Sequence, residues 1–286
     1  MIWLILNILV SGILYLIFRL FPKYKVDNLV AVIVNYLTAS TLGLIMMDTD
    51  ISGVISRPWF PIAFCMGIFF IFIFLLMAES SQVNGISMTS VANKMSLIIP
   101  VIAGIFLYNE SITWLMVTGI ILALVSVIFT SIKDKSMALS KNGTFILMLI
   151  FFGSGLIDIM IKYMQHHYLT ENEGAAFVMV IFMAAAIFGL LWMLLTQRDR
   201  FRNFNKASIV GGIALGIPNF GSIYFLILAL EKSGLQSSVL YPINNMGIVG
   251  ISALFGIFIF KEKINLINFI GILLAIAAIA LIAFGK

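Results

Sequence analysis

The chain has 286 residues, of which 62% are hydrophobic and 10% are charged, whereas soluble domains average roughly 45–50% and about 25%. This composition excludes a water-soluble globular fold. The net charge of +5 does not come from a dense basic run interleaved with aromatic residues, so nucleic acid is not an expected partner. The single cysteine, Cys65, excludes an intramolecular disulfide and a cysteine metal site.

Successive apolar runs predict an all-α membrane protein. A membrane helix needs about 20 mostly apolar residues, and runs of that length fill nearly the whole chain. They lack the alternation of a barrel strand, and backbone groups inside a bilayer must bond within their own segment. In chain order the ten predicted spans are residues 2–21, 28–47, 58–78, 83–108, 112–131, 143–165, 174–196, 208–230, 235–260 and 264–284.

An internal repeat relates the two halves of the chain at a fixed offset of 152 residues. Without any gap, this offset aligns Glu79 with Glu231, Ser81 with Ser233, Asn93 with Asn245, and Glu110 with Glu262. Each half holds five predicted spans, an odd number, so the second copy crosses the membrane in the opposite orientation. We therefore expect two inverted five-helix repeats, residues 1–135 and residues 136–286, in a multi-pass protein of the cell (inner) membrane.

Inverted repeats are typical of secondary transporters, in which a midplane site opens first to one side and then to the other. The repeat therefore favours alternating-access transport of a small metabolite or drug-like solute across the cytoplasmic membrane. The alternative is a duplicated membrane protein with another function, such as a multispan enzyme acting on a lipid-linked substrate. The chain has no phosphate-binding loop, zinc-protease or nucleophile-elbow motif, so we expect neither enzymatic activity nor ATP-driven pumping.

The basic residues suggest an orientation. Of the 17 Lys and Arg residues, 12 fall in the loops after spans 1, 5, 7 and 9. Basic loops remain in the cytoplasm, so this count predicts that both termini lie outside.

The fourth span of each half ends with an aromatic residue followed closely by glutamate. The two stretches read Pro100-Val101-Ile102-Ala103-Gly104-Ile105-Phe106-Leu107-Tyr108-Asn109-Glu110 and Leu254-Phe255-Gly256-Ile257-Phe258-Ile259-Phe260-Lys261-Glu262. A chain of this length, repeated as five plus five spans, resembles the drug/metabolite transporter superfamily, in particular its EamA-like family. The resemblance covers essentially the full length and implies a transporter.

The chain departs from the family pattern at two points. The motif proline is present as Pro100, but the equivalent position in the second half is Ser252. Family members usually keep both termini in the cytoplasm, contrary to the charge count. A shorter stretch, Ala92-Asn93-Lys94, is similar to the Ala-Leu-Asn-Lys stretch with which nucleotide-sugar transporters of the superfamily contact sugar.

Three charged residues lie within predicted spans: Lys94, Asp158 and Lys162. A charge at a helix centre costs at least roughly 2.5–3.5 kcal/mol, so each is a candidate for a functional site. Lys94 is expected to line a central cavity and to pair with Asp158 when empty or with an acidic group of the solute when loaded. The alternative is a permanent pair that locks two helices together. Lys162 is expected to reach the headgroup layer.

Asparagines in the spans form a second candidate set. Pro242 removes a backbone donor from span 9, which leaves carbonyl groups available to a ligand; Pro218 does the same in span 8. For any single asparagine the alternative is a helix-to-helix hydrogen bond. The candidate binding or coupling residues are Lys94, Asp158, Asn93, Asn35, Asn219, Tyr241, Asn244 and Asn245.

Glutamates near the span ends have structural explanations. Glu79 and Glu231 are expected to anchor span ends, and Glu110 and Glu262 to cap the helices that follow them, where a carboxylate suits the positive end of the helix dipole. We expect no cofactor and no metal site. The expected partners are a small-molecule substrate, the lipid bilayer and, as a further candidate, a coupling proton or ion.

Overall fold

A computed structural model of the protein describes the backbone of most of the chain. The described residues are 1–46, 51–100, 102–103, 113–131, 141–169, 173–196, 204–232, 237–262 and 264–285. Glu110 lies outside these residues, as do the side chains of Lys162, Glu231 and Tyr241.

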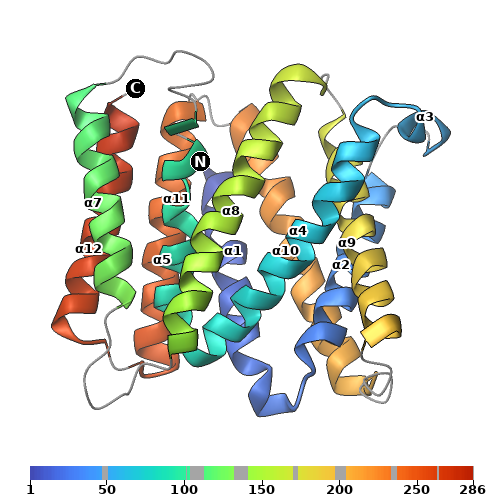
Figure 1. Cartoon of the computed structure of the whole chain (residues 1–286), viewed down its shortest axis with the longest axis horizontal. Helices are drawn as coiled ribbons and strands as arrows, with labels where there is room; N and C mark the ends of the chain where they lie inside the picture. Colours follow the sequence, from blue (N-terminus) through green and yellow to red (C-terminus); the bar gives the residue numbers. More distant parts are fainter. Residues whose placement is uncertain are drawn as a thin grey trace.

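Every regular element of the described residues is helical, which confirms the all-α prediction. In chain order the helices are α1 (Ile2–Leu20), η1 (Pro22–Tyr24), α2 (Asn28–Met46), α3 (Ile51–Ile55), α4 (Phe60–Val83), α5 (Ile86–Met95), α7 (Trp114–Ser131), α8 (Lys141–His167), α9 (Gly174–Thr196), α10 (Lys206–Lys232), α11 (Ser237–Leu254), η3 (Phe255–Ile259) and α12 (Leu266–Phe284). The long helices run between two faces of the molecule, and both chain ends lie near the upper face in Figure 1.

Six helices are individually long and apolar enough to cross a membrane, by length and composition, among the described residues. They are α1, α2, α4, α8, α9 and α10, and shorter apolar stretches lie in α7, in α11 with η3, and in α12. Helix α9 has the predicted bounds, and most of the others begin or end within two residues of theirs. The chain is a multi-pass membrane protein.

The fourth predicted span, residues 83–108, is not one continuous helix. Helix α4 continues to Val83, five residues beyond the third predicted span, and Gly85 at φ +95° separates it from α5. Helix α5 then ends at Met95, where the Leu97 amide bonds three residues back to the Lys94 carbonyl at 3.4 Å. The helix is therefore interrupted after Met95, one residue beyond Lys94, in a stretch that hydropathy alone predicts to be one continuous helix.

The two halves pack on each other in a pattern that is largely preserved when they are exchanged. The packing of α2 on α10 corresponds to that of α9 on α4, and the packing of α1 on α11 to that of α8 on α5. Three helices pack directly on their counterparts in the other half: α2 on α9, α5 on α11, and α7 on α12.

Small residues let helices of different halves approach closely, as is typical in membranes. A Cβ atom added at Gly67 in α4 would lie 2.6 Å from the Ala185 backbone nitrogen in α9. At Gly119 in α7 it would lie 2.9 Å from the Ala278 carbonyl oxygen in α12. Both contacts depend on the absence of a side chain.

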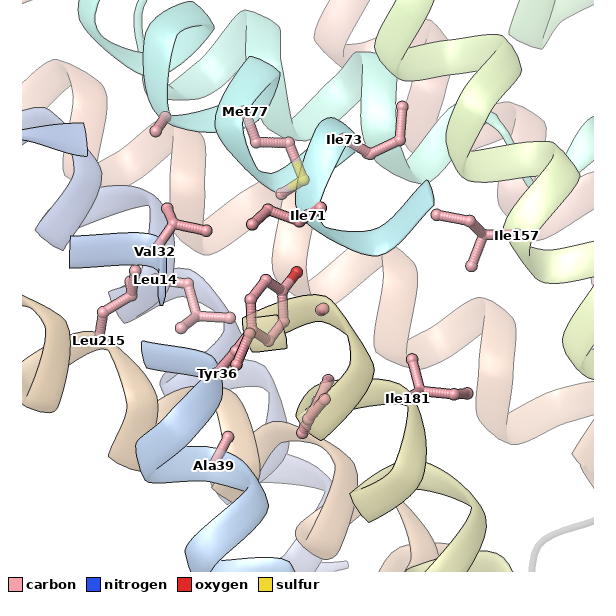
Figure 2. Packing of buried hydrophobic residues seen from close by; sticks show 14 of the residues in the cluster. Leu14, Val32, Tyr36, Ala39, Ile71, Ile73, Met77, Ile157, Ile181 and Leu215 are labelled. Carbon is pink, nitrogen blue, oxygen red and sulfur yellow. The ribbon is translucent and has the colours of Figure 1, made fainter. Parts of the chain in front are cut away.

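The larger hydrophobic core gathers helices of both halves around α2. Its members include Leu14 from α1, Tyr36 from α2, Ile73 from α4 and Ile157 from α8. Figure 2 shows Tyr36 between Leu14 and Ile71, with Ile157 across from Ile73. A second cluster joins α5, α7, α11 and α12. The cavity described next lies within the larger core.

Glu262 does not cap the helix that follows it, contrary to the prediction. Its carboxylate accepts hydrogen bonds from the Ile86 amide at 2.7 Å and the Ser87 hydroxyl at 3.1 Å, at the start of α5. Helix α12 is capped instead by Asn265, which accepts from the Asn268 amide at 2.7 Å. A residue of the second half thus caps a helix of the first half.

Candidate functional site

A cavity of about 180 Å³ lies between helices of both halves. Its wall is built by α1, α2, α4 and α5 from the first half and by α8, α9 and α10 from the second. Drug-sized ligands generally occupy sites of about 300–1,000 Å³, so this cavity suits a smaller solute. Four of the predicted site residues line it: Asn93, Lys94, Asp158 and Asn219.

Asn93 is held in place by hydrogen bonds from two sides. The Tyr15 hydroxyl in α1 donates to Asn93 Oδ1 at 2.8 Å, and Asn93 Nδ2 donates to Ser154 Oγ in α8 at 2.8 Å. This chain links three helices across the two halves. An amide nitrogen carries two hydrogens, so one N–H of Asn93 is left over for a ligand.

Lys94 and Asp158 face the same cavity from different halves. Lys94 occupies the last turn of α5, where a cation suits the negative end of the helix dipole. Asp158 lies in α8 beside the Ser96 hydroxyl and interacts electrostatically with Lys94. Among the described residues, the only oppositely charged side chains with a nitrogen and an oxygen within 4.0 Å of each other are Arg57 and Glu173, so Lys94 and Asp158 do not form a direct ion pair.

The remaining asparagines bond mostly to one another. Asn219 Nδ2 donates to Asn35 Oδ1 at 3.1 Å, so Asn35 supports a cavity residue from behind. Asn244 accepts from Asn7 at 2.9 Å, in a contact between α11 and α1 that does not line the cavity. Among the described residues, Asn245 does not line the cavity either.

Aromatic side chains form much of the apolar wall. Tyr36, Phe70, Phe74 and Phe182 all line the cavity. The Tyr36 ring lies 5.4 Å from both the Phe74 and Phe182 rings, and its hydroxyl donates to the Phe70 carbonyl oxygen at 2.9 Å. These residues, with Tyr15 and Ser154, were not predicted. In a chain with 25 Phe and 8 Tyr, no sequence signal distinguishes the aromatic residues of the cavity.

Polar contacts tie the helices together at the face where α1 ends. Arg19 donates to the Ser81 carbonyl oxygen at 3.1 Å and to that of Gln82, at the end of α4. Gln82 Nε2 donates to the Phe18 carbonyl oxygen at 3.2 Å and to Asn28 Oδ1 at 2.8 Å. We call Arg19, Asn28 and Gln82 the polar latch.

Helix α8 is the counterpart of α1, but within the described residues it does not pack on α10 and α11 as extensively as α1 packs on α4 and α5. The correspondence between the two halves is therefore not exact. Asp158, beyond the middle of α8, is exposed, whereas Asn93 and Lys94 are half-buried.

Comparisons with known proteins agree with this architecture. A profile of the EamA-like transporter family matches residues 141–284, just over half of the chain. An uncharacterised protein of Haemophilus influenzae is 25% identical over 284 residues, which cover 96% of this chain and 95% of that protein. A crystal structure with 14% sequence identity and a TM-score of 0.60 covers 96% of both chains and has the same fold. The chain belongs to the EamA-like transporter family of the drug/metabolite transporter superfamily.

Proposed function

We propose that the protein is a secondary transporter that moves a small metabolite across the cytoplasmic membrane by alternating access. The observation that carries this proposal is the cavity between the two halves, which is lined by a lysine from one half and an aspartate from the other. Charges at such depth are costly and generally mark solute or ion pathways. The proposed repeat units are residues 1–135 and residues 136–286.

The interruption of α5 supports this assignment. Transporter sites near the midplane are typically formed by discontinuous helices, whose free backbone groups contribute to binding. Here the helix ends one residue after Lys94, and Asn93 precedes it. Lys94, Asp158, Asn93 and Asn219 are the proposed binding residues, with Asn35 supporting Asn219. A proton or ion that binds at Asp158 is the proposed coupling partner.

The polar latch supports alternating access. In an inverted repeat, a state closed at one face has a counterpart closed at the other. The polar latch closes the face that carries the basic loops, which the charge count assigns to the cytoplasm. The described conformation is therefore proposed to be the one open away from the cytoplasm.

Reconstitution in proteoliposomes tests the proposal. Vesicles that contain the wild type are loaded with a metabolite mixture, and exchange of each compound is followed by mass spectrometry. We expect at least one solute to cross chemically unchanged, at a rate reduced by Asn93→Ala but not by Asn244→Ala, which removes an asparagine outside the cavity wall. Formation of a new compound without translocation would support the membrane-enzyme alternative instead.

A further inference from the structure

We propose that Glu262 is a positioning residue for the cavity: it ties α5 to the second half, so that Asn93 and Lys94 move with α11 and α12. This inference rests on the proposed transport function, because it states which helices carry the two binding residues when the cavity changes sides. Three observations carry it: the breaks at both ends of α5, the second hydrophobic core, and the contacts of the Glu262 carboxylate.

Helix α5 is a separate short segment. Gly85, at φ +95°, separates it from α4, and the helix ends at Met95 after 10 residues. Asn93 and Lys94 lie in its last turn, so these two side chains follow any movement of α5. Glycine changes backbone conformation at low steric cost, and hinges are a few such residues between rigid elements. The break at Gly85 is therefore the place where α5 can turn relative to α4.

The neighbours of α5 belong largely to the second half. Helix α5 packs more extensively on α8 and α11 than on any helix of its own half. With α7, α11 and α12 it encloses the second hydrophobic core, whose members include Met95, Met116, Val249 and Ile279. Within the described residues, every substantial contact of α7 and α12 is with each other, with α5 or with α11, and Figure 1 shows these helices side by side. The four helices therefore form one unit, with two helices from each half.

The Glu262 carboxylate closes this unit at the start of α5. It lies between η3 and α12, and its two oxygens accept from the Ile86 amide at 2.7 Å and the Ser87 hydroxyl at 3.1 Å. A Cβ atom added at Gly85 would lie 2.6 Å from the same carboxylate, so the approach is close. The Glu262 amide donates to the Gly256 carbonyl oxygen at 2.9 Å. The cap is thus anchored to η3, and it restrains the whole of α5, including the far end that reaches the cavity.

The bonds between α5 and the rest of its own half are weaker. The Ser80 and Thr89 hydroxyls bond at 2.7 Å, and the Tyr15 hydroxyl donates to Asn93 at 2.8 Å. Both bonds join neutral groups, whereas the Glu262 carboxylate is charged, and charge-assisted hydrogen bonds are roughly twice as strong as neutral ones. When the two sets of contacts compete, α5 is therefore expected to stay with the second half.

Amide hydrogen exchange tests the tie without any solute. Exchange of residues 86–95 is followed by mass spectrometry in the purified full-length protein as wild type, Glu262→Ala and Glu262→Gln. We expect Glu262→Ala to speed this exchange at least about tenfold, because a charge-assisted bond to the first turn is lost. Glu262→Gln keeps one acceptor oxygen and should restore part of the protection. Asn265→Ala is the matched control, because it removes the cap of α12 instead and should leave α5 protected.

A disulfide tests which helices move together. A Cβ atom added at Gly256 would lie 2.5 Å from the Ser87 hydroxyl oxygen, so Ser87→Cys with Gly256→Cys brings two sulfurs within bonding reach. The background is Cys65→Ala with Glu262→Ala, in which the disulfide replaces the carboxylate as the tie between α5 and η3. In vesicles loaded with the metabolite mixture, we expect the reduced protein to exchange solute more slowly than the wild type. Oxidation with copper phenanthroline should restore the wild-type rate.

A second disulfide provides the contrasting control. A Cβ atom added at Gly247 in α11 would lie 2.9 Å from Ile8 Cγ1 in α1, so Ile8→Cys with Gly247→Cys joins these two helices in a Cys65→Ala background. Helix α1 packs most extensively on α10, outside the four-helix unit. Oxidation of this pair should therefore slow solute exchange, because it ties the unit to a helix against which it moves.

Two outcomes overturn the inference. One is unchanged amide exchange of α5 in Glu262→Ala, and the other is loss of solute exchange when the disulfide between α5 and η3 forms, which would mean that α5 moves against the second half. Neither outcome removes transport itself, because the reduced protein still exchanges solute. Absence of solute exchange in the wild type would instead contradict the proposed function, and the amide exchange would still decide whether Glu262 positions α5.

Discussion

The polar latch makes a quantitative prediction about conformational equilibrium. Arg19→Ala removes two hydrogen bonds that join α1 to the end of α4. Hydrogen bonds to charged groups contribute about 1.5–3 kcal/mol each when buried. Arg19 is half-buried, so about 1.5 kcal/mol for both together allows for solvent screening. If these bonds exist only in the state closed at this face, their loss raises the population of the opposite state about tenfold.

Thiol accessibility measures this shift. Cys65 is the only cysteine of the chain, so a Cys65→Ala background with Met77→Cys places one reactive thiol on the cavity wall. An impermeant maleimide is added from the side of the basic loops to oriented vesicles. We expect labelling about tenfold faster when Arg19→Ala is added, because the thiol reacts in the state open to that side.

Arg57→Ala is the matched control. It also removes an arginine contact, the 2.9 Å pair with Glu173, but in the segments that precede α4 and α9, at the opposite face. Labelling from the basic side should stay unchanged in this variant. Equal rates in wild type and Arg19→Ala, with both proteins folded, would refute the latch, and Gln82→Ala repeats the test at its other end.

Three further predictions concern stability and binding. Glu262→Ala should destabilise the protein by about 1.5–3 kcal/mol in thermal inactivation, because it removes a charged cap from α5. Glu262→Gln should recover part of this loss. Equal stability of the wild type and both variants would contradict the role of Glu262 as the cap of α5. Gly67→Val should cost about 1–3 kcal/mol by overpacking, whereas Gly250→Ala, with open space at its Cβ position, should be neutral in the same assay. Tyr15→Phe should weaken solute binding about two- to tenfold by calorimetry, because it frees Asn93 to rotate; unchanged affinity would mean that Tyr15 does not position the amide.

Most helices could be predicted because membrane hydropathy is a local property. Residues 174–196 form α9 with the predicted bounds, since a long apolar run in a bilayer must satisfy its own backbone as a helix. The interruption after Met95 could not be predicted in this way. Residues 97–99, which follow it, are all apolar, so hydropathy alone extends the span across it.

The candidate site was partly predictable for a related reason. Lys94, Asp158, Asn93 and Asn219 were identifiable because polar side chains in apolar spans need partners, and they line the cavity. Asn244 satisfies the same rule by bonding to Asn7 instead. The sequence cannot distinguish an asparagine that lines a cavity from one that bonds to a neighbouring helix, because both have a polar partner.

The sequence by itself determined that the chain crosses a membrane repeatedly and which few polar residues are costly enough to require an explanation. Only the tertiary structure decided the partners. Glu262 precedes α12 in sequence but caps α5 in space, and four unremarkable aromatic residues from three helices converge on one cavity. The physical reason is that burial in lipid depends on each residue type, whereas a cap or a cavity depends on which surfaces meet when the two halves pack together.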